Sequence, residues 1–280
     1  MTLDAVAANR AAWNAVTPVH NAHKLDQAGY LASGGSTLFD EERALLGDLA
    51  GADVLHLMCN CGQDTLSMAA MGARVTGIDL SDVAIAQARA LAQESGLPGR
   101  FVRAEVFEGL SMLPVSAFDV VFLSYGALGW IDDVGALFAA AARVLRPSGR
   151  LVVVEFHPLV DAIADDGKID GVYGGPPIVG DEGVGDYVGA SGAALAPSGF
   201  VEAAPEAPTG TTVWFPHTTA SLLQGVLDAG LALSVVREWC HSNGWRPFPG
   251  LVGTPDRRYR WPEDGPVLPL MLGFVAVKPG

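Results

Sequence analysis

The chain has 280 residues, half of them hydrophobic, and a formal net charge of −14. This length can bury one large core, and the composition is that of a globular chain. The 17 Lys and Arg residues against 31 Asp and Glu residues disfavour a nucleic-acid partner, which would need a basic face. No apolar run reaches the roughly 18 residues of a membrane span. The first residues show no export signal and the three cysteines make no disulfide framework, so we expect a cytoplasmic protein without a membrane partner.

The beginning of the chain predicts helical structure ahead of a core. Residues 4–17 form a helical pattern, with Val6, Trp13 and Val16 among the candidate inward positions. A polar link follows over residues 18–37, and a second helix is expected over 39–49. We therefore expect a helical lid segment over residues 1–52.

Strands and helices then alternate regularly. The expected strands cover residues 54–57, 75–78, 100–104, 118–124 and 150–156. The expected helices between them cover residues 64–71, 83–95 and 134–144. Such alternation is typical of an α/β fold with a doubly wound parallel sheet, which we place at residues 53–158.

The pattern changes after the fifth strand. Residues 161–210 are rich in Gly, Ala, Pro and Asp and show no sustained period, which is uncommon inside a compact domain. We expect a cap over a site, or a mobile lid, in an insert at 159–216. A helix at 217–229, a strand at 231–238 and a last strand at 270–277 complete the core within residues 217–280.

The segment from Asp53 to Asp82 predicts half of a nucleotide site. A β-strand runs into the turn from Met58 to Gly62, and the next strand ends on Asp79. Such a turn lets the backbone approach a ligand, and the acid accepts both ribose hydroxyls. Asp79 follows Gly62 by 17 positions (79 − 62), close to the roughly 20 that such units show. Asp79 could instead cap the next helix, although Ser81 and Asp82 are better placed to do so.

Five motifs occur in an order that resembles the class I S-adenosylmethionine-dependent methyltransferases, in particular the small-molecule, natural-product-type branch. They are VLHLMCNCGQDTL, GIDLS, FVRAEVFE, FDVVFLSYGALGWIDD and VLRPSGRLVVVEFHP. The resemblance covers about residues 55–158. It implies a Rossmann-like sheet of seven strands, mostly parallel with the last strand antiparallel, helices on both faces, and a cap after the fifth strand.

The resemblance also implies a cofactor, S-adenosylmethionine, with S-adenosylhomocysteine as its product. The turn would offer backbone to the methionine moiety, Asp79 would bind the ribose, and residues after the third strand would bind adenine. The implied cofactor residues are Trp13, Met58, Cys59, Asn60, Gly62, Asp79, Leu80, Glu105, Val106 and Ser124. Glu105 could instead be a solvated loop acid, and Trp13 could serve ordinary core packing.

The turn departs from the family pattern at two positions. Met58 and Asn60 stand where the family usually has glycine. Met58 can take the place of a glycine if its φ stays negative, whereas Asn60 tolerates a left-handed backbone. His56 replaces the acid often found at the end of the first strand, as in a subset of bacterial members.

The expected reaction is methyl transfer to an oxygen or nitrogen atom, less readily to carbon, of a small-molecule acceptor, as in secondary metabolism. A positioned base helps where the acceptor must lose a proton. Tyr125, His157 and His217 are the candidate bases, with packing or structural hydrogen bonds as their alternative roles. We expect a monomer or a homodimer.

Three other interpretations stay open at this point. An NAD(P)-dependent oxidoreductase shares the strand–turn–helix start but normally carries a complete G-x-G-x-x-G, which Met58 and Asn60 interrupt. A non-catalytic cofactor-binding or scaffold protein would keep Asp79 and Glu105 without a substrate pocket. Cys59 and Cys61 have zinc-ligand character but no second pair at ligand spacing, so we expect no metal.

Overall fold

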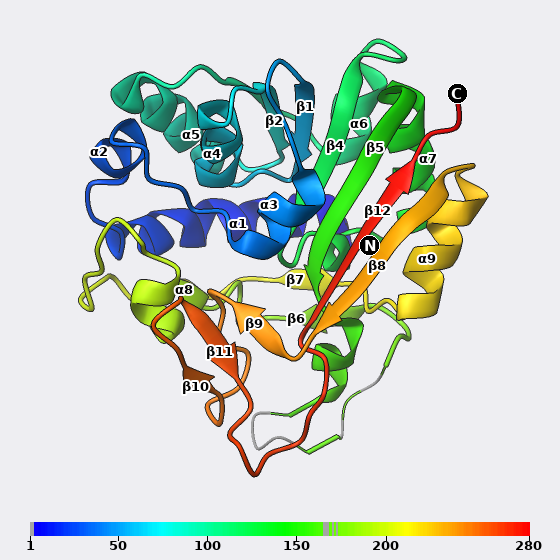
Figure 1. Ribbon diagram of the computed structural model, residues 1–280. Helices are drawn as coiled ribbons and strands as arrows, with labels where there is room; N and C mark the ends of the chain where they lie inside the picture. The colour runs from blue at the N-terminus through cyan, green and yellow to red at the C-terminus, as the bar shows by residue number, and fades with distance from the viewer. Residues whose placement is uncertain (1–2, 165–167, 170, 172) are drawn as a thin grey trace.

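The computed structural model describes residues 3–164, 168–169, 171 and 173–280. Its centre is a seven-stranded sheet in the order β3-β2-β1-β4-β5-β12-β8 (Figure 1). The strands are β1 (Asp53–Leu57), β2 (Arg74–Asp79), β3 (Arg100–Arg103), β4 (Phe118–Ser124), β5 (Leu145–Phe156), β8 (Ala232–Trp239) and β12 (Met271–Val277).

The strand directions confirm the predicted sheet. β1 pairs in parallel with β2 and β4, and β2–β3 and β4–β5 are parallel as well. The last strand, β12, runs antiparallel to both β5 and β8. The carboxyl ends of the parallel strands therefore meet at one edge of the sheet, the lower edge in Figure 1, where α/β sheets bind their ligands.

Helices cover both faces of the sheet, because successive strand residues are apolar on both sides, as in buried parallel strands. Along β4, Val121 and Leu123 join one core cluster while Val120 and Phe122 join another. The first cluster packs beneath α6 (Val106–Ser111), α7 (Val134–Val144) and α9 (Thr219–Asp228). The second lies beneath α3 (Asp40–Leu46) and α4 (Gln63–Ala70). A further cluster joins α4 to α5 (Asp82–Ser95). No described helix has the length and hydropathy to cross a bilayer.

The first helix, α1 (Ala5–Ala22), extends past Pro18, beyond the expected end at residue 17. Proline removes one backbone hydrogen bond from a helix. Side chains reinforce the neighbouring turns, since Thr17 Oγ1 donates to the Trp13 carbonyl (2.6 Å) and Asn21 Nδ2 donates to the Thr17 carbonyl (2.9 Å). The expected polar link also contains α2 (Gln27–Ala32). The packing of α1 against the rest of the fold therefore compensates for the hydrogen bond that is lost at Pro18.

Short elements appear where the sequence predicted irregular chain. The insert contains β6 (Ile178–Gly180), α8 (Tyr187–Ser191) and β7 (Thr212–Trp214), and residues 165–167, 170 and 172 of it lie outside the described residues. After β8, a three-stranded sheet has the order β10-β11-β9. Its strands are β9 (His241–Asn243), β10 (Val252–Gly253) and β11 (Arg258–Arg260). These strands have two or three residues each, too few to give a periodic signal.

The N-terminal segment and the insert contact each other below the sheet edge (Figure 1). The buried Asn9 side chain donates to the Val213 carbonyl (2.9 Å) and accepts from the Val213 N–H (2.8 Å). His23 Nε2 lies 2.7 Å from Asp186 Oδ2. Segments that are about 200 positions apart in the sequence thus form one wall, as the Asn9–Val213 separation of 204 residues indicates.

We expect Asn9→Ala to loosen this wall. The substitution leaves the buried N–H and carbonyl of Val213 without partners, which should cost about 1–3 kcal/mol. Urea unfolding and limited proteolysis would measure the loss, with cleavage rising in the N-terminal segment and the insert. Gln224→Ala, on the exposed face of α9, is the control. Equal stability and equal cleavage of Asn9→Ala and wild type would contradict the assignment.

Candidate active site

A cavity of about 530 Å³ lies at the carboxyl ends of the parallel strands. It brings together the residues predicted from the sequence, with Gly62 as the exception. Those that line it are Trp13, Met58, Cys59, Asn60, Asp79, Leu80, Glu105, Val106, Ser124, Tyr125, His157 and His217. Three parts of the chain build the walls: the N-terminal segment, the strand ends and the insert with the loop after β8.

The turn after β1 keeps a glycine-like backbone at two positions that are not glycine. Met58 has φ = 53°, Asn60 has φ = 49° and Gly62 has φ = 76°. The condition of a negative φ at Met58 is therefore not met. The left-handed turn places the Cys59 N–H 3.0 Å from the Ile78 carbonyl. A left-handed non-glycine residue costs roughly 1–2 kcal/mol, and such strain is common at functional sites.

Gly62 lies behind the cavity and begins α4. A Cβ there would come within 2.6 Å of the Phe101 ring and 3.0 Å of the Ala88 Cβ. Its N–H donates to the Cys59 carbonyl at 3.0 Å. Gly62 therefore allows the turn to pack closely against Phe101 and Ala88, and it does not itself line the cavity.

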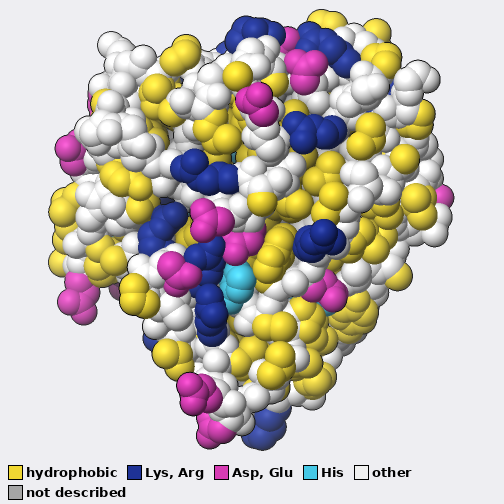
Figure 2. Space-filling model, viewed as in Figure 1, with side chains coloured by type: hydrophobic (Ala, Val, Ile, Leu, Met, Phe, Trp, Pro, Cys, Tyr) yellow, Lys and Arg dark blue, Asp and Glu magenta, His cyan; other side chains and the backbone are white. Residues whose placement is uncertain are grey.

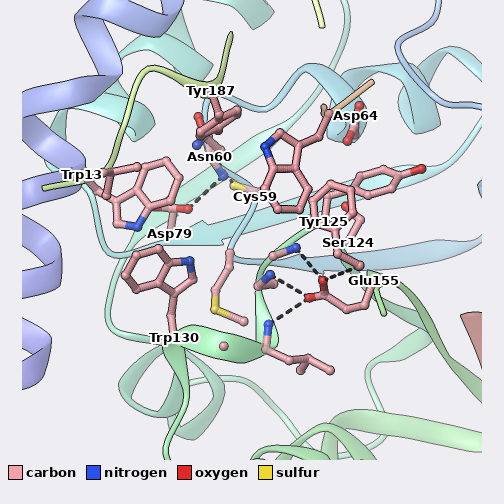
Figure 3. A pocket seen from close by; sticks show the side chains of 18 of the residues that line it. Trp13, Cys59, Asn60, Asp64, Asp79, Ser124, Tyr125, Trp130, Glu155 and Tyr187 are labelled. Atoms are coloured by element: carbon pink, nitrogen blue, oxygen red, sulfur yellow. Dashed lines mark hydrogen bonds between the residues drawn. The ribbon is translucent and has the colours of Figure 1, made fainter. Parts of the chain in front are cut away.

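Asp79 ends β2 with a buried carboxylate that faces the cavity (Figure 3). Its Oδ2 accepts from the Asn60 N–H and its Oδ1 accepts from the Ser81 N–H, each at 2.8 Å. Burial raises the pKa of Asp79 to about 6, although these donors oppose the shift. The helix cap is Ser81, whose side chain accepts from the Ala84 N–H (3.0 Å). The prediction that Asp79 is not the cap is confirmed, and each carboxylate oxygen keeps a further lone pair for a ligand.

Glu105 has a structural role that the sequence analysis did not consider. It is the N-cap of α6, and its Oε2 accepts from the N–H groups of Phe107 (2.8 Å) and Glu108 (3.0 Å). The neighbouring Val106 is buried and lines the cavity. One carboxylate oxygen of Glu105 is thus committed to the helix, and the other can meet a ligand.

Glu155 is a site residue that the sequence analysis missed. It is the second-last residue of β5, and its buried carboxylate accepts from four backbone N–H groups, those of Gly126, Ala127 (2.6 Å), Leu128 (2.9 Å) and Phe156 (3.1 Å) (Figure 3). Burial raises its pKa to about 7, against these donors. An acid inside the apolar run RLVVVEF was the available signal.

Tyr125 lines the cavity, but its hydroxyl belongs to a buried network. Asn243 Nδ2 donates to the hydroxyl at 3.1 Å. Burial and the nearby Glu42 carboxyl raise the pKa of Tyr125 well above its usual value. A phenol that holds its proton this firmly acts as a hydrogen-bond partner rather than as a base.

His157 is held by hydrogen bonds at both ring nitrogens. Its Nδ1 accepts from the Leu159 N–H (3.0 Å), so the proton of a neutral ring must sit on Nε2, which lies 2.9 Å from Glu238 Oε1. Burial lowers the pKa of His157, although Glu238 opposes the shift. The neutral ring therefore has no free lone pair in this arrangement.

His217 differs from the other two candidate bases. Its Nε2 lies 2.8 Å from the Ile131 carbonyl, which can only accept, so Nε2 carries the proton. The Nδ1 atom then keeps a lone pair. Of the three candidates, His217 is the one whose neutral ring can still accept a proton.

Aromatic side chains cover one side of the cavity. Trp13 and Trp130 meet edge to face at 5.6 Å between ring centroids, and Trp130 meets Trp214 at 5.1 Å. Tyr187 of the insert contacts Trp13 at 6.4 Å. Figure 3 shows Trp13, Trp130 and Tyr187 around the same space as Asp79. These rings join the N-terminal segment to the insert along one side of the cavity.

Two further polar residues define the surroundings of the turn. His56 is buried beside Thr65, with 2.8 Å between Nδ1 and Oγ1, and burial lowers its pKa to about 4, so the ring is neutral. Lys24 also lines the cavity, and the sequence analysis missed it. Burial lowers the pKa of its ammonium, although Cys61 and Asp64 oppose the shift.

We expect the stability of wild type relative to Glu155→Gln to depend on pH. The folded pKa of about 7 exceeds the ordinary value of 4.5, so folded Glu155 binds its proton more tightly than the unfolded chain does. Its contribution to stability therefore falls as pH rises from about 4.5 to about 7 and is constant above that range. Urea unfolding at pH 5 and pH 8 measures this change, with exposed Glu108→Gln as the control. Identical pH dependence in wild type and Glu155→Gln would refute the assignment.

Comparisons with known proteins agree with this geometry. Residues 54–149 match a family of methyltransferase domains. A relative from Talaromyces variabilis, an S-adenosyl-L-methionine-dependent Diels-Alderase named iccD, is 36% identical over 129 residues, which are 44% of this chain and 44% of that protein. A ubiquinone biosynthesis O-methyltransferase from Xanthomonas oryzae pv. oryzae is 38% identical over 104 residues, or 37% of this chain and 43% of that protein. The chain thus spans less than half the length of these two relatives.

A solved structure extends the likeness to most of the chain. The S-adenosylmethionine-dependent methyltransferase from Mesorhizobium loti superposes with a TM-score of 0.58 at 23% identity, over 87% of this chain and 99% of that one. At this identity the likeness concerns the fold. The chain therefore has the Rossmann-like fold of that structure, and its residues 54–149 match the family of methyltransferase domains.

Proposed function

We propose that the protein transfers a methyl group from S-adenosylmethionine to an oxygen or nitrogen atom, less readily to carbon, of a small molecule. The observation that carries this proposal is the pairing of the buried Asp79 carboxylate with the left-handed turn 58–62 at one cavity. The match to methyltransferase domains supports it. Cytoplasmic location, a monomer or homodimer, and the lack of a nucleic-acid partner stay predictions.

The residues present fit the cofactor. The cavity of about 530 Å³ falls in the range of roughly 300–1,000 Å³ found for ligand pockets. Asp79 would accept the ribose hydroxyls, while Leu80 and Val106 offer apolar surface for adenine. The turn from Met58 to Gly62 and the Lys24 cation would hold the methionine end.

Bound S-adenosylmethionine would supply an electrophilic methyl group on a sulfonium. The protein's task is to align the acceptor and to exclude water. Alignment alone can contribute roughly 7–11 kcal/mol. Ser124 and Tyr125 border the cavity at the end of β4, and the aromatic rings of Trp13 and Trp130 cover it.

A base is needed where the acceptor loses a proton. Geometry favours His217 over His157 and Tyr125, because its Nδ1 keeps a lone pair while Nε2–H is fixed on the Ile131 carbonyl. The N-terminal segment and the insert would close over both ligands, since Trp13 and Tyr187 line one wall together.

A cofactor-binding protein without methyl transfer is the second candidate. The Talaromyces relative is named a Diels-Alderase that depends on S-adenosyl-L-methionine. The aromatic rings among the cavity's lining residues, such as Trp13, Trp130 and Trp245, also suit a reaction that only folds and aligns its substrate. Turnover separates the two, because methyl transfer produces S-adenosylhomocysteine and a pericyclic reaction leaves the cofactor intact.

We expect Asp79→Asn to weaken binding of S-adenosylhomocysteine by about 1.5–3 kcal/mol, the range for hydrogen bonds to a charged group. Wild-type affinity should fall as pH drops through about 6, where Asp79 gains its proton, and the variant should lack this dependence. Titration calorimetry measures both, with exposed Asp82→Asn as the control. Unchanged binding in Asp79→Asn, or binding of NAD but not of S-adenosylhomocysteine, would remove the basis of the proposal.

We expect His217→Gln to lower kcat about 100-fold or more for an acceptor that must lose a proton, the lower bound for a general base. S-adenosylhomocysteine affinity should stay unchanged. A screen of phenols, amines and carboxylic acids with labelled cofactor identifies the acceptor for this assay. His157→Gln serves for comparison, because its loss should lower stability rather than alter the pH profile of kcat. Wild-type kcat in His217→Gln would exclude His217 as the base.

A further inference from the structure

Arg257 is an arginine of the cavity wall that has no acidic partner in the described part of the chain. Its side chain lines the cavity, its Nη2 donates to the Thr37 carbonyl (3.2 Å), and its guanidinium stacks on the Phe39 ring at 4.1 Å from the centroid. Among the described residues no carboxylate lies within ion-pair distance of it. A guanidinium has five N–H donors, so most of those of Arg257 remain for a ligand.

Acidic side chains lie close to Arg257 in the fold, but they bind its neighbour, Arg258. Arg258 binds both oxygens of Glu41 (3.0 and 2.9 Å) and also Asp256 (2.5 Å). Figure 2 shows Lys and Arg side chains interleaved with Asp and Glu side chains over β9, β10 and β11. Arg258 and its acids thus neutralise one another on this face, while Arg257 points to the cavity instead.

Arg257 has a backbone conformation that is unfavourable for a residue other than glycine. Arg257 ends the turn between β10 and β11 with φ = 64°, a conformation that favours glycine. Its N–H donates to the Thr254 carbonyl (3.1 Å), and its carbonyl accepts from the Gly244 N–H (2.9 Å). A long charged side chain at a left-handed turn position indicates a use for that side chain.

Aromatic rings line the cavity next to this cation. Tyr125 contacts Phe39 at 6.4 Å and Phe156 at 5.4 Å between centroids, and Phe156 contacts Trp245 at 4.3 Å. All four rings line the cavity. This wall fits a flat apolar body, and the end of the wall at Phe39 carries the Arg257 guanidinium.

We propose that Arg257 anchors a carboxylate on the methyl acceptor, whose aromatic or otherwise flat body lies along Phe39, Tyr125, Phe156 and Trp245. Arginine suits this role because its planar fork binds both oxygens of a carboxylate. The inference rests on the proposed function, since it assigns the acceptor side of the same cavity. The chain has a net charge of −14, which would repel anions. A cavity arginine without an ion pair among the described residues would nevertheless attract an anionic ligand locally.

The test uses pairs of probes that differ only in charge. Titration calorimetry would measure binding of 4-hydroxybenzoate and 4-hydroxycinnamate, each beside its primary amide, to the 280-residue chain saturated with S-adenosylhomocysteine. We expect each acid to bind about 10-fold or more tightly than its amide, as for a hydrogen bond to a charged group. Arg257→Gln should remove this preference, and Arg257→Lys should retain part of it. Exposed Arg237→Gln, outside the cavity, should behave as wild type.

The controls separate this inference from the proposed function. Arg257→Gln should bind S-adenosylhomocysteine as wild type does and melt at a similar temperature. Weaker cofactor binding in that variant would make Arg257 a cofactor residue and overturn the inference. Equal affinity for acids and amides, a preference that survives in Arg257→Gln, or no binding of either series would overturn it as well. Failure of wild type to bind S-adenosylhomocysteine would instead count against the proposed function.

Discussion

Buried backbone N–H groups at the carboxyl edge of the sheet must find acceptors, and two carboxylates provide them. Asp79 accepts from the turn after β1 and from Ser81, and Glu155 accepts from the loop after β4. Each acid thereby connects the end of its own strand to the loop of a neighbouring strand. The cavity depends on these bonds, because an unpaired buried N–H would cost as much as a lost hydrogen bond.

The two carboxylates remain poised because burial raises the pKa values of both, to about 6 for Asp79 and about 7 for Glu155. The two carboxylates nevertheless differ in how many of their lone pairs accept backbone hydrogen bonds. Asp79 has two backbone donors and spare lone pairs at the cavity, whereas Glu155 is occupied by four backbone donors. The same chemical group thus keeps acceptor capacity at the cavity at one strand end and supports a loop at another.

The cover of the cavity comes from segments that lie outside the two main core clusters of the sheet. The helix α1, the insert and the sheet β10-β11-β9 each lack a large core, and they are stabilised by contacts such as Asn9 with Val213 and Arg258 with Glu41. Elements of this kind open at lower free energy than a central sheet does. A cover of this construction suits a cavity whose ligands must enter and leave.

The sequence by itself determined the central sheet, because the strands are continuous apolar runs and the helices between them have clear caps, such as Ser81 and the left-handed Gly96 of α5. It also placed Asp79 and the turn at one site, since both lie at the ends of adjacent parallel strands. Local sequence could not show that α1 continues past Pro18, that Met58 adopts φ = 53°, or that Glu105 caps α6. Tertiary structure decided these, along with the hydrogen bonds that occupy His157 and leave His217 with a lone pair. The reason is physical: periodicity reports which residues are buried, whereas hydrogen-bond partners far apart in the sequence are chosen only when the chain packs.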